Sequence, residues 1–208
     1  HDTIQNMIRA AAFDPGIEQR ALAIFQAIAD AEGKIHNVPT EKVHFHEVGA
    51  LDSIVDIVAA AICIEYLQPE FVLCGSIELG SGFVDCAHGR FPVPAPATQE
   101  LLQTAPCTYG GVDGECTTPT GAAILAACVH EYAPKRAFRP SKIGYGIGYK
   151  DFAVPNVLRV ALGEYDLESK STSHIKLEAN IDDMSPEAFE PLMNCLLYTS
   201  PSPRDRIR

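Results

Sequence analysis

The chain has 208 residues, 47% hydrophobic and 21% charged, which is typical of a globular chain with one or two domains. With 27 acidic and 16 basic residues its formal net charge is -11, so it offers no basic footprint for a nucleic-acid backbone or an anionic membrane surface. The longest apolar run, residues 57–64, is far shorter than the ~20 residues that cross a bilayer. We therefore expect neither nucleic acid nor a membrane as a partner.

The first elements that the apolar pattern predicts are two helices joined by a short extended segment. Asp14-Pro15 is typical of a helix start, and the apolar residues after it recur on one face until Gly33. Residues 42–48 read as extended. Residues 52–67 form the second helix, which is capped by Asp52 or Ser53 and is apolar on almost all sides.

The remaining elements alternate between strands and helices. The pattern predicts a strand at 71–79, a short helix through 102 after the prolines at 92–96, a helix from 117–123 to Tyr132, and strands at 143–149 and 156–164. We therefore predict the α/β class, and a mixed α+β arrangement stays open.

Composition also predicts the domain organisation. We assign residues 1–165 to a main domain, 166–173 to a polar linker, and 174–194 to the start of a second domain. Residues 195–208 have no amphipathic period, and their amino acids resemble a sequencing-library transposase adaptor translated in frame, so we expect them to be a non-native tail without a functional role.

The seven cysteines lie at least nine residues apart and include no Cys-x-x-Cys pair. This spacing favours neither a zinc knuckle nor a thioredoxin-type redox site. Buried, reduced thiols that pack as small hydrophobes are the favoured interpretation. Because reduced thiols are usual inside cells, we expect a cytoplasmic protein.

The densest group of metal-binding side chains lies around the start of the second helix. In an extended backbone His44 and His46 point to one face, and Glu47 follows them directly. Asp52 and Asp56 lie one helical turn apart on a common helix face. Imidazole and carboxylate ligands suit nickel, zinc, manganese or iron. The sequence therefore predicts a metal site built from these five residues.

The prediction of a metal site depends mainly on Asp56. Aliphatic residues flank it on both sides, and a carboxylate buried among them costs several kcal/mol unless it is paired or coordinated. No lysine or arginine occurs in residues 43–89, so the local candidates are a histidine or a metal. Two simpler interpretations stay open: Asp52 is only a helix cap, and the His-x-His pair is a hydrogen-bonded structural pair.

A second candidate site is the helix start that contains Thr118, Thr120 and Gly121. Free N–H groups, hydroxyls and a glycine that permits close approach form an anion site, so a substrate phosphate could bind there. Ordinary capping explains the same residues equally well. A glycine motif that binds a dinucleotide opens a helix, but no helix is predicted after the glycines of residues 144–148. These glycines therefore do not indicate a dinucleotide site.

Two further candidates lie in predicted loops. His88 follows a strand end, where it could act as a third metal ligand or as a catalytic proton shuttle, although a surface histidine in a turn is the simpler alternative. Asp182 and Asp183 could hold Mn²⁺ or Mg²⁺ with a nucleotide, or serve only as charges at a helix entry.

Four strings, in this order along the chain, resemble the LarC family of nickel insertion proteins. They are HFHEVGALDSIVDI at 44–57, HGRFPVPAPAT at 88–98, TTPTGAA at 117–123 and NIDDMSPE at 180–187. The resemblance runs over residues 1–194. It implies a lyase-class enzyme that inserts nickel into pyridinium-3,5-bisthiocarboxylic acid mononucleotide, with CTP and Mn²⁺ or Mg²⁺, to complete the nickel-pincer cofactor of lactate racemase-type enzymes.

The resemblance also implies roles and departures. Because they lie in the matching motifs, the five residues of the predicted metal site become candidates for holding nickel. The helix start at Thr118 likewise becomes a candidate for binding the substrate phosphate. An N-terminal strand and a glycine-rich acidic segment that are usual in the family are absent here, and the nucleotide-handling half stops after its first strand. We therefore expect a fragment whose activity requires the rest of the protein.

Two other functions fit the same residues. In a metal-dependent phosphohydrolase, the histidines and aspartates of the predicted metal site would hold ions that activate water. In a non-catalytic nickel-binding protein, they would only store the metal. A homo-oligomer also stays open, because sequence does not give the oligomeric state.

Overall fold

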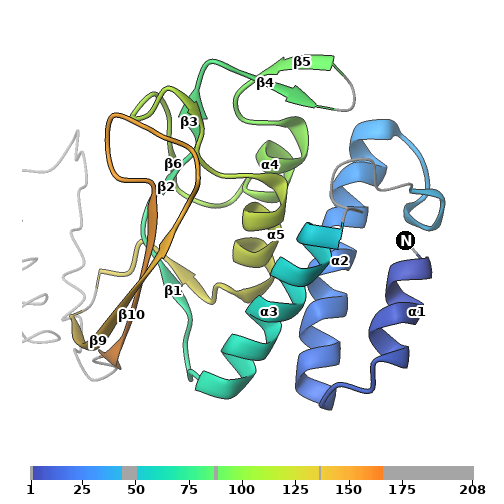
Figure 1. The fold of residues 1–208 in the computed structure, drawn as a ribbon, viewed down its shortest axis with the longest axis horizontal. Helices are drawn as coiled ribbons and strands as arrows, with labels where there is room; N and C mark the ends of the chain where they lie inside the picture. The colour runs from blue at the N-terminus through green and yellow to red at the C-terminus, as the bar shows by residue number, and fades with distance from the viewer. Residues whose placement is uncertain (1, 44–50, 87–88, 136, 166–208) are drawn as a thin grey trace, which may run out of the picture. The chain divides into compact units, whose positions relative to one another are not determined.

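In the computed structural model of the chain, residues 2–43, 51–86, 89–135 and 137–165 are described (Figure 1). The chain divides into two units, residues 1–167 and 168–208, and all of the described residues belong to the first. The linker, the second domain and the adaptor-like tail that the sequence predicts therefore lie outside the described residues.

The helices pack around one central helix. They are α1 (Asp2–Ala10), α2 (Pro15–His36), the 3₁₀ turn η1 (Thr40–Lys42), α3 (Leu51–Leu67), α4 (Pro96–Leu101) and α5 (Pro119–Cys128). The central helix is α2, which contacts each of the others (Figure 1). Their shared core is apolar and consists of Ile4, Ile8, Ala21, Ile24, Phe25, Ile28, Ile57, Ala61, Ala123 and Cys128. No helix among the described residues is long and apolar enough to cross a membrane.

The sequence pattern explains the start of α2 but not its end. Pro15 lies in the first turn, where its missing N–H leaves no bond unmade. The helix runs to His36, three residues past the expected stop at Gly33, and ends where Asn37 adopts a left-handed conformation. Gly33 instead allows the chain at Val38 to lie close to the helix, because a Cβ at position 33 would be only 3.0 Å from the carbonyl oxygen of Val38.

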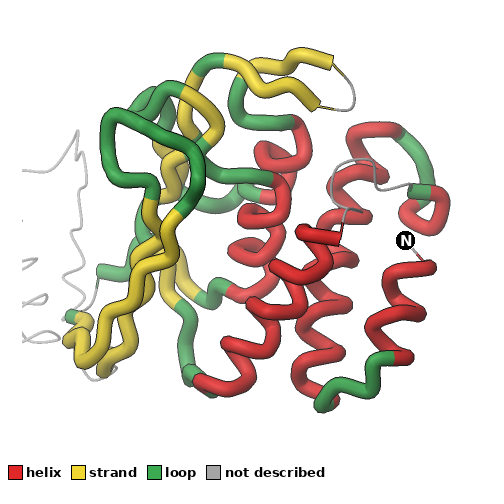
Figure 2. Tube along the Cα trace, in the orientation of Figure 1, coloured by secondary structure: helices red, strands yellow, loops and turns green. Residues whose placement is uncertain are grey.

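The strands form two-stranded pairs (Figure 2). Two pairs are parallel: β1 (Leu73–Cys74) with β8 (Glu131–Tyr132), and β2 (Ile77–Glu78) with β6 (Cys107–Thr108). Three are antiparallel: β3 (Gly80–Ser81) with β7 (Gly114–Glu115), β4 (Phe83–Cys86) with β5 (Gly89–Pro92), and β9 (Phe138–Ile147) with β10 (Val157–Tyr165). The predicted mixed α/β class is confirmed.

Several predicted boundaries are wrong for tertiary reasons. The helix expected to reach Tyr132 ends at Cys128, because the residues after it pair with β1, starting with the bond from the His130 N–H to the Val72 oxygen at 2.8 Å. The strand expected at 71–79 is split into β1 and β2, which pair with different partners. Lys42, expected at the start of an extended segment, lies in η1. The two C-terminal strands are confirmed as the β9–β10 hairpin, displaced by a few residues.

The carboxylate of Glu78 orders the loops that lead to α5. It accepts hydrogen bonds from the Thr108 hydroxyl at 2.8 Å and from the N–H groups of Gly80 and Gly111 at 2.9 and 3.1 Å. These bonds, the Thr108 bond foremost, lower the pKa of Glu78 from its ordinary value of 4.5. Its backbone oxygen accepts a bond from the Thr117 hydroxyl at 2.7 Å, just before α5 begins.

We expect Glu78→Gln to lower the free energy of unfolding by about 1 kcal/mol at neutral pH, since hydrogen bonds to a charged acceptor are lost at a half-buried site. Because the folded-state pKa is lowered, this stabilisation is present above the unfolded pKa, which is the ordinary value of 4.5, and is lost as pH falls through the folded pKa. Urea unfolding near neutral pH and near pH ~3 measures it, with exposed Glu70→Gln as the control. An equal difference from wild type at both pH values would contradict this role.

The packing of α3 gives a matched pair of substitutions on one helix. Ile57 is 0% exposed and Val55 is 56% exposed. We expect Ile57→Ala to lower the free energy of unfolding by about 2–5 kcal/mol, because it leaves a cavity in the shared core. Val55→Ala should change it by less than about 0.5 kcal/mol. Denaturant titration of both variants checks the assigned face of α3, and similar losses for the two would refute it.

Candidate functional site

The aspartates of the predicted metal site lie on the exposed face of α3. The helix begins at Leu51, so Asp52 lies inside its first turn, and the expected caps at Asp52 or Ser53 are wrong. Asp52 and Asp56 are both exposed. The expected burial of Asp56 is therefore wrong, because only one side of this apolar helix is covered: Ser53, Ile57 and Ala61 face the core, whereas Leu51 remains 71% exposed.

The exposure of Asp56 means that desolvation gives no reason for a cation to bind there. An exposed carboxylate keeps its hydration, so nothing requires a cation to neutralise it. The two aspartates remain one turn apart and accessible to solvent, which still permits weak metal binding. Their predicted partners His44, His46 and Glu47 lie outside the described residues, as do His88, Asp182 and Asp183. Within the described ranges, no group of three or more His, Cys, Asp or Glu side chains could hold a metal ion.

A hydrogen bond joins the two motifs that the sequence singled out. The Thr120 hydroxyl in the first turn of α5 donates to the hydroxyl of Ser53 in the first turn of α3, at 3.4 Å. Ser53 is only 7% exposed, so the contact is part of the interior. The amino-terminal ends of α3 and α5, 67 residues apart in sequence, are therefore neighbours. Asp52 precedes Ser53 directly and lies at this junction.

The first turn of α5 is capped as one of the open interpretations predicts. The Thr118 hydroxyl accepts the N–H of Gly121 at 3.3 Å, and Pro119 occupies the first helical position. Thr118 is exposed, and Thr120 and Gly121 are half-buried. Capping is thus confirmed, and phosphate binding by the same residues stays a prediction.

Among the described cysteines, Cys63, Cys74, Cys107, Cys116 and Cys128 are free thiols, and one of these is buried. Cys128 is buried, Cys63 is exposed, and the other three are intermediate. Burial is the largest cause that raises the pKa of four thiols, namely Cys74, Cys107, Cys116 and Cys128. These four thiols therefore stay protonated, in agreement with the expected role as small hydrophobes, although full burial holds for Cys128 alone.

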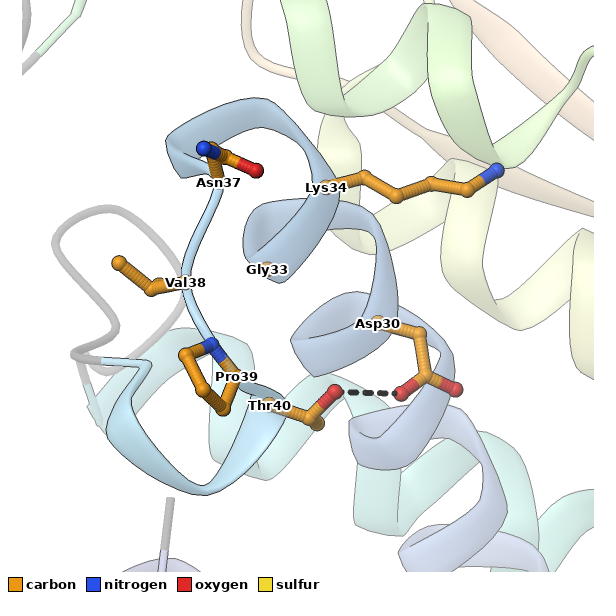
Figure 3. Close-up of a pocket in the computed structure, with 7 residues that line it drawn as sticks. All are labelled: Asp30, Gly33, Lys34, Asn37, Val38, Pro39 and Thr40. Atoms are coloured by element: carbon orange, nitrogen blue, oxygen red, sulfur yellow. Dashed lines mark hydrogen bonds between the residues drawn. The ribbon is translucent and has the colours of Figure 1, made fainter.

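A pocket of about 540 Å³ lies at the carboxyl end of α2 (Figure 3). It is lined by Asp30, Gly33, Lys34, Asn37, Val38, Pro39 and Thr40. The Thr40 hydroxyl donates to Asp30 at 3.1 Å, and Lys34 extends away from that pair and bonds to Glu100 of α4. Asp30 also accepts a bond from Gln26, so both charged groups that line this pocket already have partners, and the pocket offers no unused charged group.

A second pocket, of about 260 Å³, carries chemistry that the sequence reasoning missed. It is lined by Glu32, Ile35, His36, Cys86, Phe91, Pro96 and Ala97. The Nε2 atom of His36 lies 3.2 Å from Oε2 of Glu32. The i, i+4 spacing of Glu32 and His36 in the sequence is the signal that could have indicated this pair, because residues four apart lie on one helix face.

Comparison with known proteins shows which family the chain is similar to. The family model described as "Nickel insertion protein" matches residues 1–200. The pyridinium-3,5-bisthiocarboxylic acid mononucleotide nickel insertion protein of Clostridium kluyveri is 50% identical over 187 residues, which cover 90% of this chain and 47% of that protein. The protein of the same name from Clostridium acetobutylicum is 50% identical over 186 residues, 89% of this chain and 44% of that protein.

A third protein of that name, from Desulfitobacterium hafniense, is 46% identical over 199 residues, 93% of this chain and 50% of that protein. No solved structure matches the chain. The chain thus spans about half the length of the curated relatives it matches. A family match over residues 1–200 agrees with the four motifs quoted above, and the chain belongs to the nickel insertion protein family.

Proposed function

We propose that this chain, as part of a longer protein, acts in the insertion of nickel into pyridinium-3,5-bisthiocarboxylic acid mononucleotide. The observation that carries the proposal is the 50% identity over 187 residues to the nickel insertion protein of Clostridium kluyveri, whose name gives this substrate. The product would be the nickel-pincer cofactor of lactate racemase-type enzymes, and the reaction would belong to the lyase class.

The chemistry that suits this function is ligand exchange. We propose that His44, His46, Glu47, Asp52 and Asp56 hold nickel before its transfer. The exposure of the two aspartates supports a loosely held ion, because exposed carboxylates stay hydrated and bind weakly. The two thiocarboxylate sulfurs of the acceptor are softer ligands than carboxylate oxygen, so they can take the metal over. The net charge of -11 also favours capture of cations.

The junction of α3 and α5 suggests where the acceptor lies. We propose that Thr118, Thr120 and Gly121 bind its phosphate at the start of α5, where the helix dipole favours an anion. The bond between Ser53 and Thr120 supports this placement, because it brings that helix start next to Asp52. A phosphate held there would leave the rest of the mononucleotide within reach of the α3 carboxylates.

The remaining roles come from the family resemblance. We propose that His88 moves a proton during the exchange, and that Asp182 and Asp183 bind Mn²⁺ or Mg²⁺ together with CTP. Carboxylate oxygens are the ligands that these hard ions prefer. A cytoplasmic location is supported by the free thiols of Cys63, Cys74, Cys107, Cys116 and Cys128, since oxidising compartments favour disulfides.

Nickel loading of the full-length protein tests the metal residues. We expect His44→Ala/His46→Ala to bind substantially less nickel than wild type, because two imidazole ligands are removed. Asp52→Asn/Asp56→Asn should weaken binding less, since exposed carboxylates contribute modestly. Metal analysis after gel filtration measures both, with exposed Glu41→Gln as the control. Nickel content equal to wild type in the double histidine variant would exclude those residues from the site.

Product analysis separates nickel insertion from the two other functions. Transfer of nickel to the mononucleotide supports insertion. Turnover of a generic phosphomonoester would support a metal-dependent phosphohydrolase instead. Stoichiometric nickel binding that the mononucleotide does not affect would support a storage protein.

Thr118 tests the phosphate site separately from capping. We expect Thr118→Ala to lower the free energy of unfolding by about 1 kcal/mol, because the cap to Gly121 is lost. If the hydroxyl also binds phosphate, KM for the mononucleotide should rise by about tenfold, with kcat little changed. Thr118→Ser keeps the hydroxyl and serves as the control. A stability loss with an unchanged KM would leave capping as its sole role.

A further inference from the structure

The side of α3 that faces away from the core carries a second apolar surface. The buried residues of this helix, Ser53, Ile57 and Ala61, lie on one side. On the other side, exposed apolar residues recur three or four positions apart, and we call them the α3 stripe: Leu51, Val55, Ala59, Ile62 and Tyr66. In Figure 1 no described element crosses in front of α3. An apolar helix face of this length normally packs against another element.

The β9–β10 hairpin is the other place where large apolar side chains are exposed together. It is fastened near its two ends. The Nζ atom of Lys150, in its loop, lies 3.7 Å from Oε2 of Glu115, and the Tyr165 hydroxyl donates to Glu131 at 2.9 Å. Between these ends, every residue of β9 is exposed. Because a two-stranded hairpin gains little stability without a covered face, this one lacks a cover among the described residues.

One face of this hairpin is the richer in large apolar side chains, and we call it the hairpin face. It consists of residues that the register pairs across the strands: Ile143 with Ala161, Tyr145 with Arg159, and Ile147 with Val157. Tyr145 is 60% exposed and Ile147 is 85% exposed. Since adjacent residues point to opposite faces, Leu158 lies on the other face, where its partner is Gly146.

The α3 stripe and the hairpin face carry opposite charge. Helix α3 contains three acidic residues and no basic one, and Asp52 and Asp56 flank the stripe. Strands β9 and β10 together contain three basic residues and one acidic one, and Arg159 lies on the hairpin face itself. No ion pair within the described ranges engages Asp52, Asp56 or Arg159. In a chain of net charge -11, these basic strands are the exception.

We propose that two copies of this protein associate by packing the hairpin face of one copy on the α3 stripe of the other. Both surfaces are apolar and exposed, and the acidic flank of one meets the basic residue of the other. An acidic partner would match only the hairpin, and a basic partner only α3, whereas a second copy covers both. The two surfaces do not cover each other within one copy, because the side chains of both remain exposed.

The contact joins two different surfaces, so each copy uses both of them. Such contacts close either as a dimer with two reciprocal contacts or as a ring. Asp52 and Asp56 lie beside the stripe, so a partner on the stripe leaves them at the rim of the contact, accessible to water. The association therefore does not depend on nickel and is compatible with the metal role proposed for these aspartates.

Disulfide cross-linking of the full-length protein tests this contact. Cys63 is exposed on α3, next to Ile62 of the stripe. Under mild oxidation by diamide, a Tyr145→Cys/Cys63→Ser copy should therefore form a reducible link to Cys63 of a tagged, otherwise unmodified copy. Peptide mass spectrometry identifies the joined peptides. Leu158→Cys/Cys63→Ser is the matched control, because Leu158 is 67% exposed but lies on the opposite face of the hairpin.

The rates of cross-linking decide the outcome. We expect the link from position 145 to form at least about tenfold faster than that from position 158, because only the former is held next to α3. No link, or equal rates, would overturn the proposal. With Cys63 retained, a link from Tyr145→Cys to Cys63 of the same copy would overturn it too, because the hairpin would then cover its own α3. Protection of position 145 from iodoacetamide without any link would show that another part of the protein covers the hairpin, which would also overturn it.

A charge exchange tests whether electrostatic matching selects the second copy. Adding Arg159→Glu to the Tyr145→Cys/Cys63→Ser copy should slow the link, because a like charge then faces the aspartates of α3. Adding Asp56→Arg to the tagged copy should restore the rate. The substituted side chains are exposed, so the fold should tolerate these changes. A rate that neither substitution alters would contradict the charge matching on which the choice of a second copy rests.

Discussion

Burial of the apolar face of α2 is the constraint on which the described fold depends. Ile24, Phe25 and Ile28 are 0% exposed, and α1, α3, α4 and α5 all contact this helix. The close packing of a core means that each neighbour's position follows from the side chains of α2. The same helix ends in Glu32 and His36, so the element that holds the core together also fixes the geometry of the second pocket.

The exposed aspartates change the physical basis of the nickel hypothesis. A buried lone charge would have required a partner, whereas Asp52 and Asp56 on an exposed helix face are compatible with a cation or with water alone. Evidence for a role in nickel chemistry therefore comes from family membership rather than from electrostatic necessity.

Tertiary packing brings together motifs that are far apart in the chain. The Ser53–Thr120 bond places the start of α3 beside the start of α5, and the second pocket joins the end of α2 to β4 and α4. Glu78 supports this arrangement from the strand side through its bonds to the loops before α5. A transfer reaction needs such convergence, because donor and acceptor groups must meet within a few ångströms.

Sequence by itself determined the α/β class, the helices that begin at Pro15, near Asp52 and at Pro119, the β9–β10 hairpin and the family. These follow from local periodicity, proline and capping chemistry, or from strings of adjacent residues. Only the tertiary structure decided which side of α3 is covered, where α5 gives way to β8, and that Cys86 shares a pocket with Glu32 and His36. The reason is that burial and strand pairing depend on partners distant in sequence, and an apolar pattern does not say which of its sides another element will cover.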